Sequence, residues 1–572
     1  MGRLIHNSLL VSLLTYLSEQ FRALVGGSFL SRIFNCSAAA DQSASNSLTA
    51  GAARKLVASA AGGIRHGFAS GVESSMLVGL YRRFCGAVLS ASVRSAGVFF
   101  VSAAFYSAIA AGVHILSGDA AVTFVTDIIT IALMLVLGLA MLASGKTLGK
   151  KTCESAILSF VLFDLLGINR MAVKTDAAPV HRFAFAFFAG LAFGAVSYFA
   201  SALSVLWFAV AAVFFAVILY SPESGLLASM ILIAVSGMDK IYIVLMATLF
   251  SYALKLLRGK RSLTLKSEDI FALFALLVFV IAFPAATPAR TAVIAAAYFM
   301  TCNLLRTVSL LRKSAVCVSL GLGINMLYRT ASSITGLFGI SIGSVTGITA
   351  ERFTAEDPLL VTISVIWMLC VMRGGDYVMP PVLKVIFASC AVFSAAFSAS
   401  DPVIIAALAG AFIYFAFCSG RLFNVAFSYL ILVPAVLCLR HIGAGGVTFV
   451  SVNILPVELS GVSTVNLLFG GAGCGEGLYA SLVSAFGLLG CLLFAAMLFM
   501  LLSRANVSAS ADGGAMRSFC AASVAATAVF LILGCVSDTL GGDRELLTFW
   551  IFCGMISAAG NAIRAVTGEE YL

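Results

Sequence analysis

The sequence predicts an all-α, polytopic integral membrane helical bundle, and three observations support this prediction. Hydrophobic residues make up 61% of the 572 residues and charged residues only 10%, whereas soluble domains carry about 45–50% and about 25%. The mean hydropathy is +1.07. The apolar residues gather in runs close to the roughly 20 residues that a helix needs to cross a bilayer. This composition excludes a soluble enzyme, a disordered tail and a fibre.

The basic residues predict the orientation of the chain in the membrane. Lys and Arg number 35 against 25 Asp and Glu, which gives a net charge of +10. They stand in the segments between apolar runs, where they set topology, so we expect no nucleic-acid partner. If the spans alternate, the basic segments share one face, which the positive-inside rule assigns to the cytoplasm. We therefore expect a multi-pass protein of the cytoplasmic (inner) membrane, surrounded by membrane lipids, with both termini cytoplasmic.

The order of the segments predicts four parts and about 14–16 transmembrane helices. The parts are an amphipathic N-terminal segment (1–36), an Ala/Ser/Gly-rich linker and cytoplasmic segment (37–95), a membrane hairpin with a cytoplasmic loop (96–180) and a larger membrane domain (181–572). Residues 1–36 lack the apolar core and the cleavage site of a signal peptide and fit a helix lying among lipid headgroups. A disordered leader is the alternative.

The cysteines predict neither a metal site nor a disulfide framework. Most of the 14 cysteines lie inside apolar runs, without a CxxC pair and without His at ligand spacing. This pattern is typical of small residues in a membrane core. We expect no metal and no cofactor.

Two predicted outer loops, about 331–356 and 440–475, are longer than is usual in helical bundles, so function is expected there. The first loop follows Arg329 and contains Arg352. A guanidinium matches phosphate oxygens in two-point contacts, so both residues are candidates for binding an anionic headgroup or diphosphate. The alternative for each is an arginine that reaches the water boundary from the membrane.

The second long loop begins with Arg440 and His441. A neutral imidazole beside a lipid diphosphate could act as general base for an incoming hydroxyl; an amphipathic anchor at the interface is the alternative. The glycine tract 470–475 resembles a phosphate-binding turn but lacks the Lys-Ser/Thr of a Walker motif. Its alternative is a tight turn before the apolar span 477–502.

A third, short outer loop holds a cluster of charged residues. The cluster consists of residues close together in the sequence: Asp538, Asp543, Arg544 and Glu545. Trp550 follows, and Trp is a residue type that anchors helices at the membrane interface. The pattern favours a salt-bridge cluster that compensates its own charge. A part in the functional site is the second interpretation.

From about residue 180 onward the chain resembles the O-antigen ligase and oligosaccharide-polymerase-like membrane glycosyltransferases, in particular the divergent forms of Firmicutes. The segments that carry the resemblance are LKLLRGKRSLTLKSEDIFALFALLVFVIAF, LFGGAGCGEGLYASLVSAFGLLGCLLF and SDTLGGDRELLTFWIFCGMISAAG. The second is similar to the family's glycine-bearing outer turn and the segment after it. The third is similar to its last outer loop and final helix, where an Asp, an Arg and a Phe-Trp pair recur.

The resemblance implies a cavity under the outer loops that binds an undecaprenyl-diphosphate-linked oligosaccharide. Arginines would hold the diphosphate, and a His would activate the acceptor hydroxyl, without metal or nucleotide. In this sequence Glu476 stands where the family has that His, with Tyr479 at the matching Tyr. Asp401 stands where the family has an Arg, and Ala485 where it has a Glu.

The candidate residues follow from these patterns. As base the sequence offers Glu476 or His441, and as substrate-binding residues Arg329, Arg352, Arg440, Tyr479, Asp538 and Arg544. A catalytically degenerate member that binds lipid-linked glycan, or acts as a partner of other envelope glycan-assembly proteins, is the alternative. A transporter is a third alternative. It is disfavoured because few charged residues lie in the middle of the predicted membrane spans and the sequence shows no clear inverted repeat.

Overall fold

A computed structural model describes most of residues 75–567, and it confirms the predicted fold class. The described ranges are 75–116, 124–174, 179–261, 269–273, 288–337, 357–374, 379–396, 401–419, 463–470, 477–511, 514–536 and 542–567, with a few single residues between them. These ranges are helices joined by turns, with two isolated β-bridges. Within them, seven helices are long and apolar enough to cross a membrane, and shorter apolar helices of 10–17 residues accompany them. The predicted segment 1–36 lies outside the described residues.

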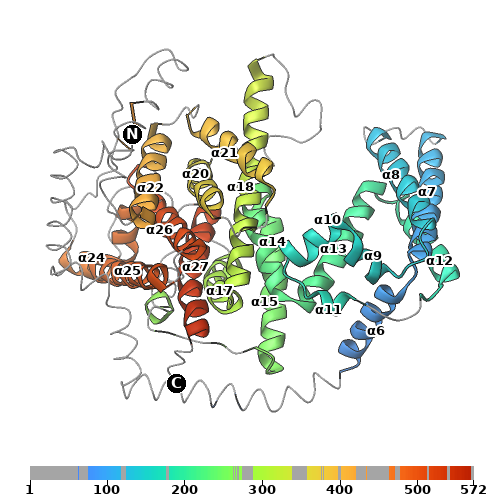
Figure 1. The fold of residues 1–572 in the computed structure, drawn as a ribbon, viewed down its shortest axis with the longest axis horizontal. Helices are drawn as coiled ribbons and strands as arrows, with labels where there is room; N and C mark the ends of the chain where they lie inside the picture. Colours follow the sequence, from blue (N-terminus) through green and yellow to red (C-terminus); the bar gives the residue numbers. More distant parts are fainter. Residues whose placement is uncertain are drawn as a thin grey trace, which may run out of the picture. The chain divides into compact units, whose positions relative to one another are not determined.

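The chain divides into two compact units. The N-terminal unit is Ala61–Gly225 with Ala253–Arg261; the C-terminal unit contains Leu226–Tyr252 and Ser262–Leu572. In the first unit the helices, blue to green in Figure 1, are α6 (Met76–Ser90), α7 (Val93–Leu116), α8 (Phe124–Leu142), α9 (Leu148–Glu154), α10 (Ala156–Ser159), the π-helix Phe160–Leu165, α11 (Arg170–Val173), α12 (Phe183–Val196) and α13 (Ala202–Tyr220). Helices α14 (Pro222–Val235) and α15 (Met238–Leu257) contribute to both units.

Glycines set the packing of α7, α8 and α12 in the N-terminal unit. Gly190 and Gly194 are four residues apart on α12 and face α7. A Cβ at Gly190 would lie 1.9 Å from Oγ of Ser102. Gly97 of α7 packs against Gly138 of α8 in the same way, because a Cβ at Gly97 would lie 2.9 Å from the carbonyl oxygen of Gly138. Small residues at this spacing let helix backbones approach closely in membranes, where lipid offers no hydrophobic force between helices.

The C-terminal unit is built around α26 and α27. Its helices are α17 (Pro288–Leu304), α18 (Val308–Leu337), α20 (Pro358–Arg373), α21 (Pro381–Ala396), α22 (Asp401–Ser419), α24 (Thr464–Phe469), α25 (Leu478–Ala511), α26 (Ala515–Leu533) and α27 (Asp543–Thr567). Trp367 of α20 is fully buried and stacks on Phe552 of α27, with ring centroids 5.6 Å apart. Trp550 is equally buried and meets Tyr298 edge-on at 5.9 Å. These aromatic contacts join α17, α20 and α27 into one core.

Helix α18 continues into the loop predicted at 331–356. It ends at Leu337, so the first residues of that segment are helical. The hydroxyls of Ser333 and Thr335 donate to backbone carbonyls one turn earlier, at 3.0 Å in both cases. Because these hydroxyls are satisfied within the helix, Ser and Thr do not end it here.

Helix α25 is broken, whereas the sequence predicted an uninterrupted span over 477–502. Gly487 adopts a left-handed φ of 61° within it. A Cβ at this position would lie 2.3 Å from the carbonyl oxygen of Leu468. The short helix α24 therefore reaches the backbone of α25 at the break, which only glycine permits.

Candidate functional site

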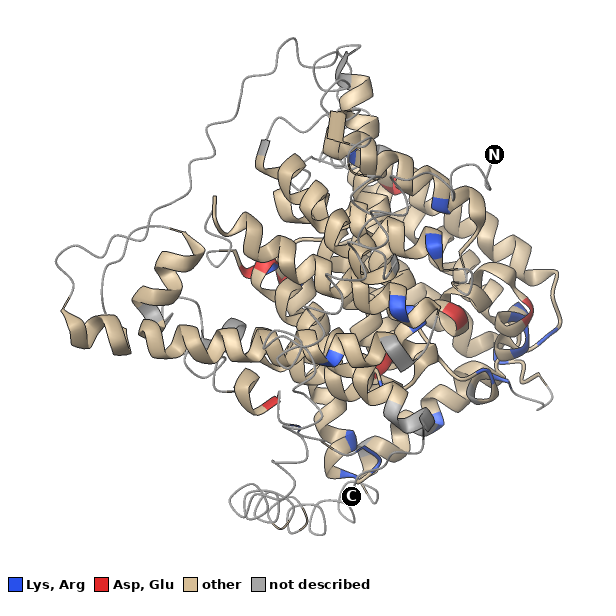
Figure 2. Cartoon of the chain, turned by 60° about the vertical axis from the view of Figure 1, so that its left-hand side comes forward, with Lys and Arg blue, Asp and Glu red and all other residues tan. Residues whose placement is uncertain are grey.

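The structure describes some of the predicted site residues and not others. Arg329, Tyr479 and Arg544 lie in described helices. The residues that lie outside the described part of the chain are the predicted bases Glu476 and His441 and the predicted binding residues Arg352, Arg440 and Asp538. Charged residues are sparse along the described helices (Figure 2). A buried charge therefore calls for a physical account.

Arg544 lies in a buried polar cluster at the N-terminal end of α27. Only 7% of its surface is exposed. Its Nη2 donates to the carbonyl oxygen of Ser236, between α14 and α15, at 2.8 Å. The carboxylates of Asp357 and Glu545 both act electrostatically on this guanidinium. We call Ser236, Asp357, Arg544 and Glu545 the Arg544 cluster.

The local sequence fixes Asp357 in this cluster. Asp357 precedes Pro358, a residue that favours the first turn of a helix because it has no N–H to satisfy. Oδ1 of Asp357 accepts hydrogen bonds from the backbone N–H groups of Leu359 and Leu360, at 2.9 and 3.4 Å. Asp357 is thus the N-cap of α20. The cap holds its carboxylate at the helix end that faces Arg544 and Glu545.

The cluster contains more negative than positive charge. The pKa of Asp357 is raised from 3.8 to about 6, mainly by burial and also by the nearby negative charge of Glu545. The two backbone N–H groups and Arg544 oppose the shift without cancelling it. One guanidinium therefore faces two carboxylates at this end of the bundle.

A small apolar cavity lies directly beneath the Arg544 cluster. Leu360, three residues after Asp357, and Thr548, four residues after Arg544, both line it. The other lining residues come from α14, α18, α20 and α27: Met230, Ile233, Ala234, Val318, Leu322, Ile363, Ile551 and Phe552. Polar groups therefore stand one helical turn above an apolar space.

Sequence reasoning missed Asn325, which faces the same interhelical space. Val318 and Leu322 of α18 line the cavity, and Asn325 follows them by seven and three residues on that helical face. Asn325 is fully buried, and neither side-chain amide atom has a hydrogen-bond partner in the structure. Arg329 continues this face one turn further along α18. The sequence does contain a signal for Asn325, namely a side-chain amide within an apolar run. Burying such a group costs free energy unless it forms hydrogen bonds or serves a function.

Tyr479 takes part in helix packing. It stands in the first turn of α25, and its hydroxyl donates to the carbonyl oxygen of Leu531 in α26 at 2.9 Å. This bond ties the start of α25 to α26. The predicted role of Tyr479 in substrate binding stays a prediction.

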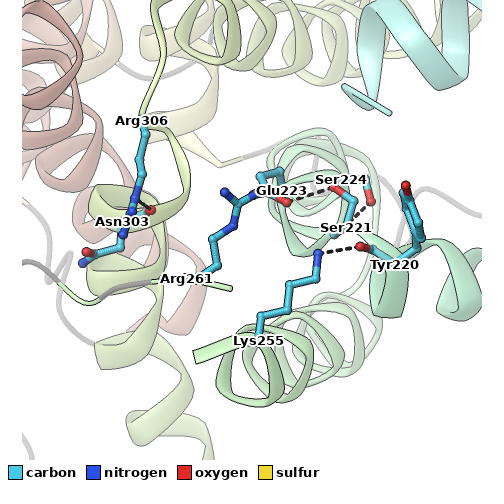
Figure 3. Close-up of polar contacts among 8 residues, drawn as sticks. All are labelled: Tyr220, Ser221, Glu223, Ser224, Lys255, Arg261, Asn303 and Arg306. Carbon is cyan, nitrogen blue, oxygen red and sulfur yellow. Dashed lines mark hydrogen bonds and ion pairs between the residues drawn. The ribbon is translucent and has the colours of Figure 1, made fainter. Parts of the chain in front are cut away.

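A second polar cluster occupies the basic end of α15 (Figure 3). Glu223, buried in the first turn of α14, accepts an ion-paired hydrogen bond from Arg261 and a hydrogen bond from Oγ of Ser221 at 2.9 Å. Nζ of Lys255 donates to the carbonyl oxygen of Tyr220, the last residue of α13, at 2.5 Å. This end belongs to the N-terminal unit.

In the described part of the chain, no group of three or more His, Cys, Asp and Glu residues is arranged to hold a metal ion. The cysteines described there are free thiols, most of them buried in helices.

No family model, characterised protein or solved structure matches this chain. The resemblance to O-antigen ligase-like proteins therefore stays a prediction from the sequence segments.

The geometry of the Arg544 cluster limits what it can do chemically. The carboxylates of Asp357 and Glu545 already act electrostatically on Arg544, so its charge is not available to a diphosphate on its own. Cations of the neighbouring segments would have to supply the attraction. Asp357, with its raised pKa, can exchange a proton near neutral pH, a property that general acid–base groups need.

Proposed function

We propose that the protein transfers or polymerises an oligosaccharide linked to undecaprenyl diphosphate. The reaction would take place on the outer face of the cytoplasmic membrane, in cell-surface polysaccharide biosynthesis, with both termini of the chain in the cytoplasm. Its partners would be the lipid-linked oligosaccharide, membrane lipids and other envelope glycan-assembly proteins.

One structural observation supports this proposal beside the sequence resemblance. Asp357, at the end of the first long outer loop, lies with Arg544, at the start of the helix after the last outer loop. Two segments far apart in the sequence, each predicted to carry part of the site, thus converge above one cavity. A substrate held by both loops would lie over the ends of α18, α20 and α27.

The proposed chemistry is a glycosyl transfer. A base, Glu476 or His441, accepts the proton of an acceptor hydroxyl, and the hydroxyl oxygen attacks the anomeric carbon of the lipid-linked sugar. The bond from that carbon to the diphosphate oxygen breaks, and undecaprenyl diphosphate leaves with the bonding electrons. Arg352 and Arg440 hold the diphosphate, because Arg544 is already compensated.

The net negative charge of the Arg544 cluster favours one alternative. A carboxylate 4 Å from a phosphate costs about 1 to 4 kcal/mol between water-like and surface-like dielectric. Asp401 and Glu476 add further acids at positions where the family carries Arg and His. A catalytically degenerate protein that binds lipid-linked glycan as an assembly partner is therefore the second candidate.

An in-vesicle transfer assay tests the proposal. Purified protein is supplied with lipid-linked oligosaccharide, and product is compared between wild type and the variants Glu476→Gln, His441→Ala and Arg352→Ala. Loss of a general base lowers rates by about 10²- to 10⁴-fold, so we expect one of the first two variants to lose activity to that extent. Arg352→Ala is expected to weaken substrate binding about tenfold or more.

Arg170→Ala is the matched control for the loss of an arginine. Arg170 is exposed; its guanidinium makes a 3.8 Å ion pair with Asp164 and lies 5.3 Å from the ring centroid of Phe163. Because such surface contacts contribute little, this variant should transfer at the wild-type rate. Full activity of all three site variants would overturn the site assignment. Binding of lipid-linked glycan without any product would favour the second candidate.

A further inference from the structure

The basic end of α15 carries a dense positive charge. From Lys255 to Lys266 the sequence contains five basic residues and no acidic residue. Arg261 is held by Glu223, and Lys255 by the carbonyl oxygen of Tyr220. These contacts fix the first and last cations of 255–261 in place and leave a net positive charge at this end of the N-terminal unit.

A glycine turn folds this segment back over the end of α15. Gly259 adopts a left-handed φ of 67°. Its N–H donates to the carbonyl of Leu256 at 3.1 Å, and the N–H of Lys260 donates to the carbonyl of Lys255 at 2.9 Å. These two bonds form a Schellman motif, which satisfies carbonyls at the end of the helix. The motif places Lys260 and Arg261 beside Lys255 rather than along a continuing helix.

Helix α6 lies at the same end of α13. The hydroxyl of Tyr81 in α6 donates to the carbonyl oxygen of Ala216 at 2.6 Å, one turn before Tyr220. On α6, apolar residues recur every four positions and are between 43% and 84% exposed: Met76, Leu80, Phe84 and Val88. An exposed apolar stripe on a helix that also carries Arg82 and Arg83 is typical of helices that lie in a membrane interface.

We propose that the basic end of α15, together with α6, is a binding site for an anionic phospholipid. The cations of 255–261 contact the phosphate headgroup, and the stripe of α6 lies against the acyl chains. Clusters of Lys and Arg immediately beyond a membrane helix attract anionic headgroups, each contributing near the surface. The adjoining apolar stripe identifies the partner as a lipid rather than a soluble phosphate, because a soluble anion has no apolar part that could contact the stripe.

The test is the affinity of the purified full-length protein, in detergent, for phosphatidylglycerol and for phosphatidylcholine, measured by native mass spectrometry. We expect phosphatidylglycerol to bind more tightly. Arg258→Gln/Lys260→Gln should weaken its binding about 30-fold. These two residues are chosen because the contacts of Glu223 and Tyr220, which hold Arg261 and Lys255, stay intact. Leu80→Ser, on the stripe of α6, should weaken the binding of both lipids and leave the preference for phosphatidylglycerol over phosphatidylcholine unchanged.

Lys150→Gln/Lys151→Gln is the matched control. It removes the same charge from α9 of the same unit, at exposed side chains outside the proposed site. This control should bind phosphatidylglycerol as wild type does, and millimolar inorganic phosphate should not displace the lipid. Equal binding of the two lipids, equal losses in both double variants, or full displacement by inorganic phosphate would each overturn the proposal. The unfolding temperature of each variant without lipid shows whether it is folded.

Discussion

Replacing Arg544 with Gln is expected to lower the free energy of unfolding by about 3–5 kcal/mol. Arg544 is buried, donates to the carbonyl oxygen of Ser236 and lies beside two carboxylates. Without the guanidinium, Asp357 and Glu545 repel each other in a poorly solvated site. Arg544→Lys keeps the charge and should recover part of the loss. The measurement is equilibrium unfolding in detergent, and a loss below about 1 kcal/mol would contradict the account.

Asp357→Asn is the matched control, and its expected effect depends on pH. Asn caps a helix as well as Asp does. Because the pKa of Asp357 is raised from 3.8 to about 6 in the folded protein, its protonated form contributes stability below about pH 4. That contribution is lost as the pH rises through about 6. The variant should therefore be at least as stable as wild type at pH 7.5, and the two should become equal below about pH 4.

Gly190→Leu is expected to destabilise the N-terminal unit by about 3 kcal/mol or more. A Cβ at Gly190 already meets the Ser102 hydroxyl at 1.9 Å and the Phe99 carbonyl at 2.6 Å. Backbone cannot move aside without separating α12 from α7, and overpacking of this kind costs about 1–3 kcal/mol and occasionally more. The loss should appear as a lower unfolding temperature of the purified protein.

Gly112→Leu controls for the loss of a glycine from a membrane helix. Gly112 is on α7, where no atom lies within 4 Å of an added Cβ, and Leu favours a helix over Gly by about 1 kcal/mol. This variant should be as stable as wild type or slightly more stable. Equal stability of Gly190→Leu and wild type would show that α7 and α12 do not pack as described.

The fold class could be predicted from sequence because it depends on composition and on the length of apolar runs. The breaks within helices could not. Gly487 interrupts α25 because α24 reaches its backbone, a contact between segments that no local pattern contains. In α18 the reverse holds, since Ser333 and Thr335 satisfy their hydroxyls within the helix and let it continue to Leu337.

Only the part of the candidate site that charged residues mark in the sequence could be predicted. Arg544 and its acidic neighbours stand close together in the sequence, so a self-compensating cluster could be proposed. Asp357 lies far from Arg544 in the sequence, so its place in the cluster depends on the packing of α20 against α27, which the stacking of Trp367 on Phe552 shows. Asn325 was missed because a single amide in an apolar run gives no pattern; its importance follows from burial without a hydrogen-bond partner.

The most direct test of the proposed function is the equilibrium binding of lipid-linked oligosaccharide to the purified protein in lipid nanodiscs. We expect saturable binding that requires both the glycan and the diphosphate. Arg352→Ala should weaken it about tenfold, a loss of about 1.4 kcal/mol, and Arg170→Ala should leave it unchanged. If wild-type protein shows no saturable binding, or binds undecaprenyl phosphate without glycan equally well, the proposed function is wrong.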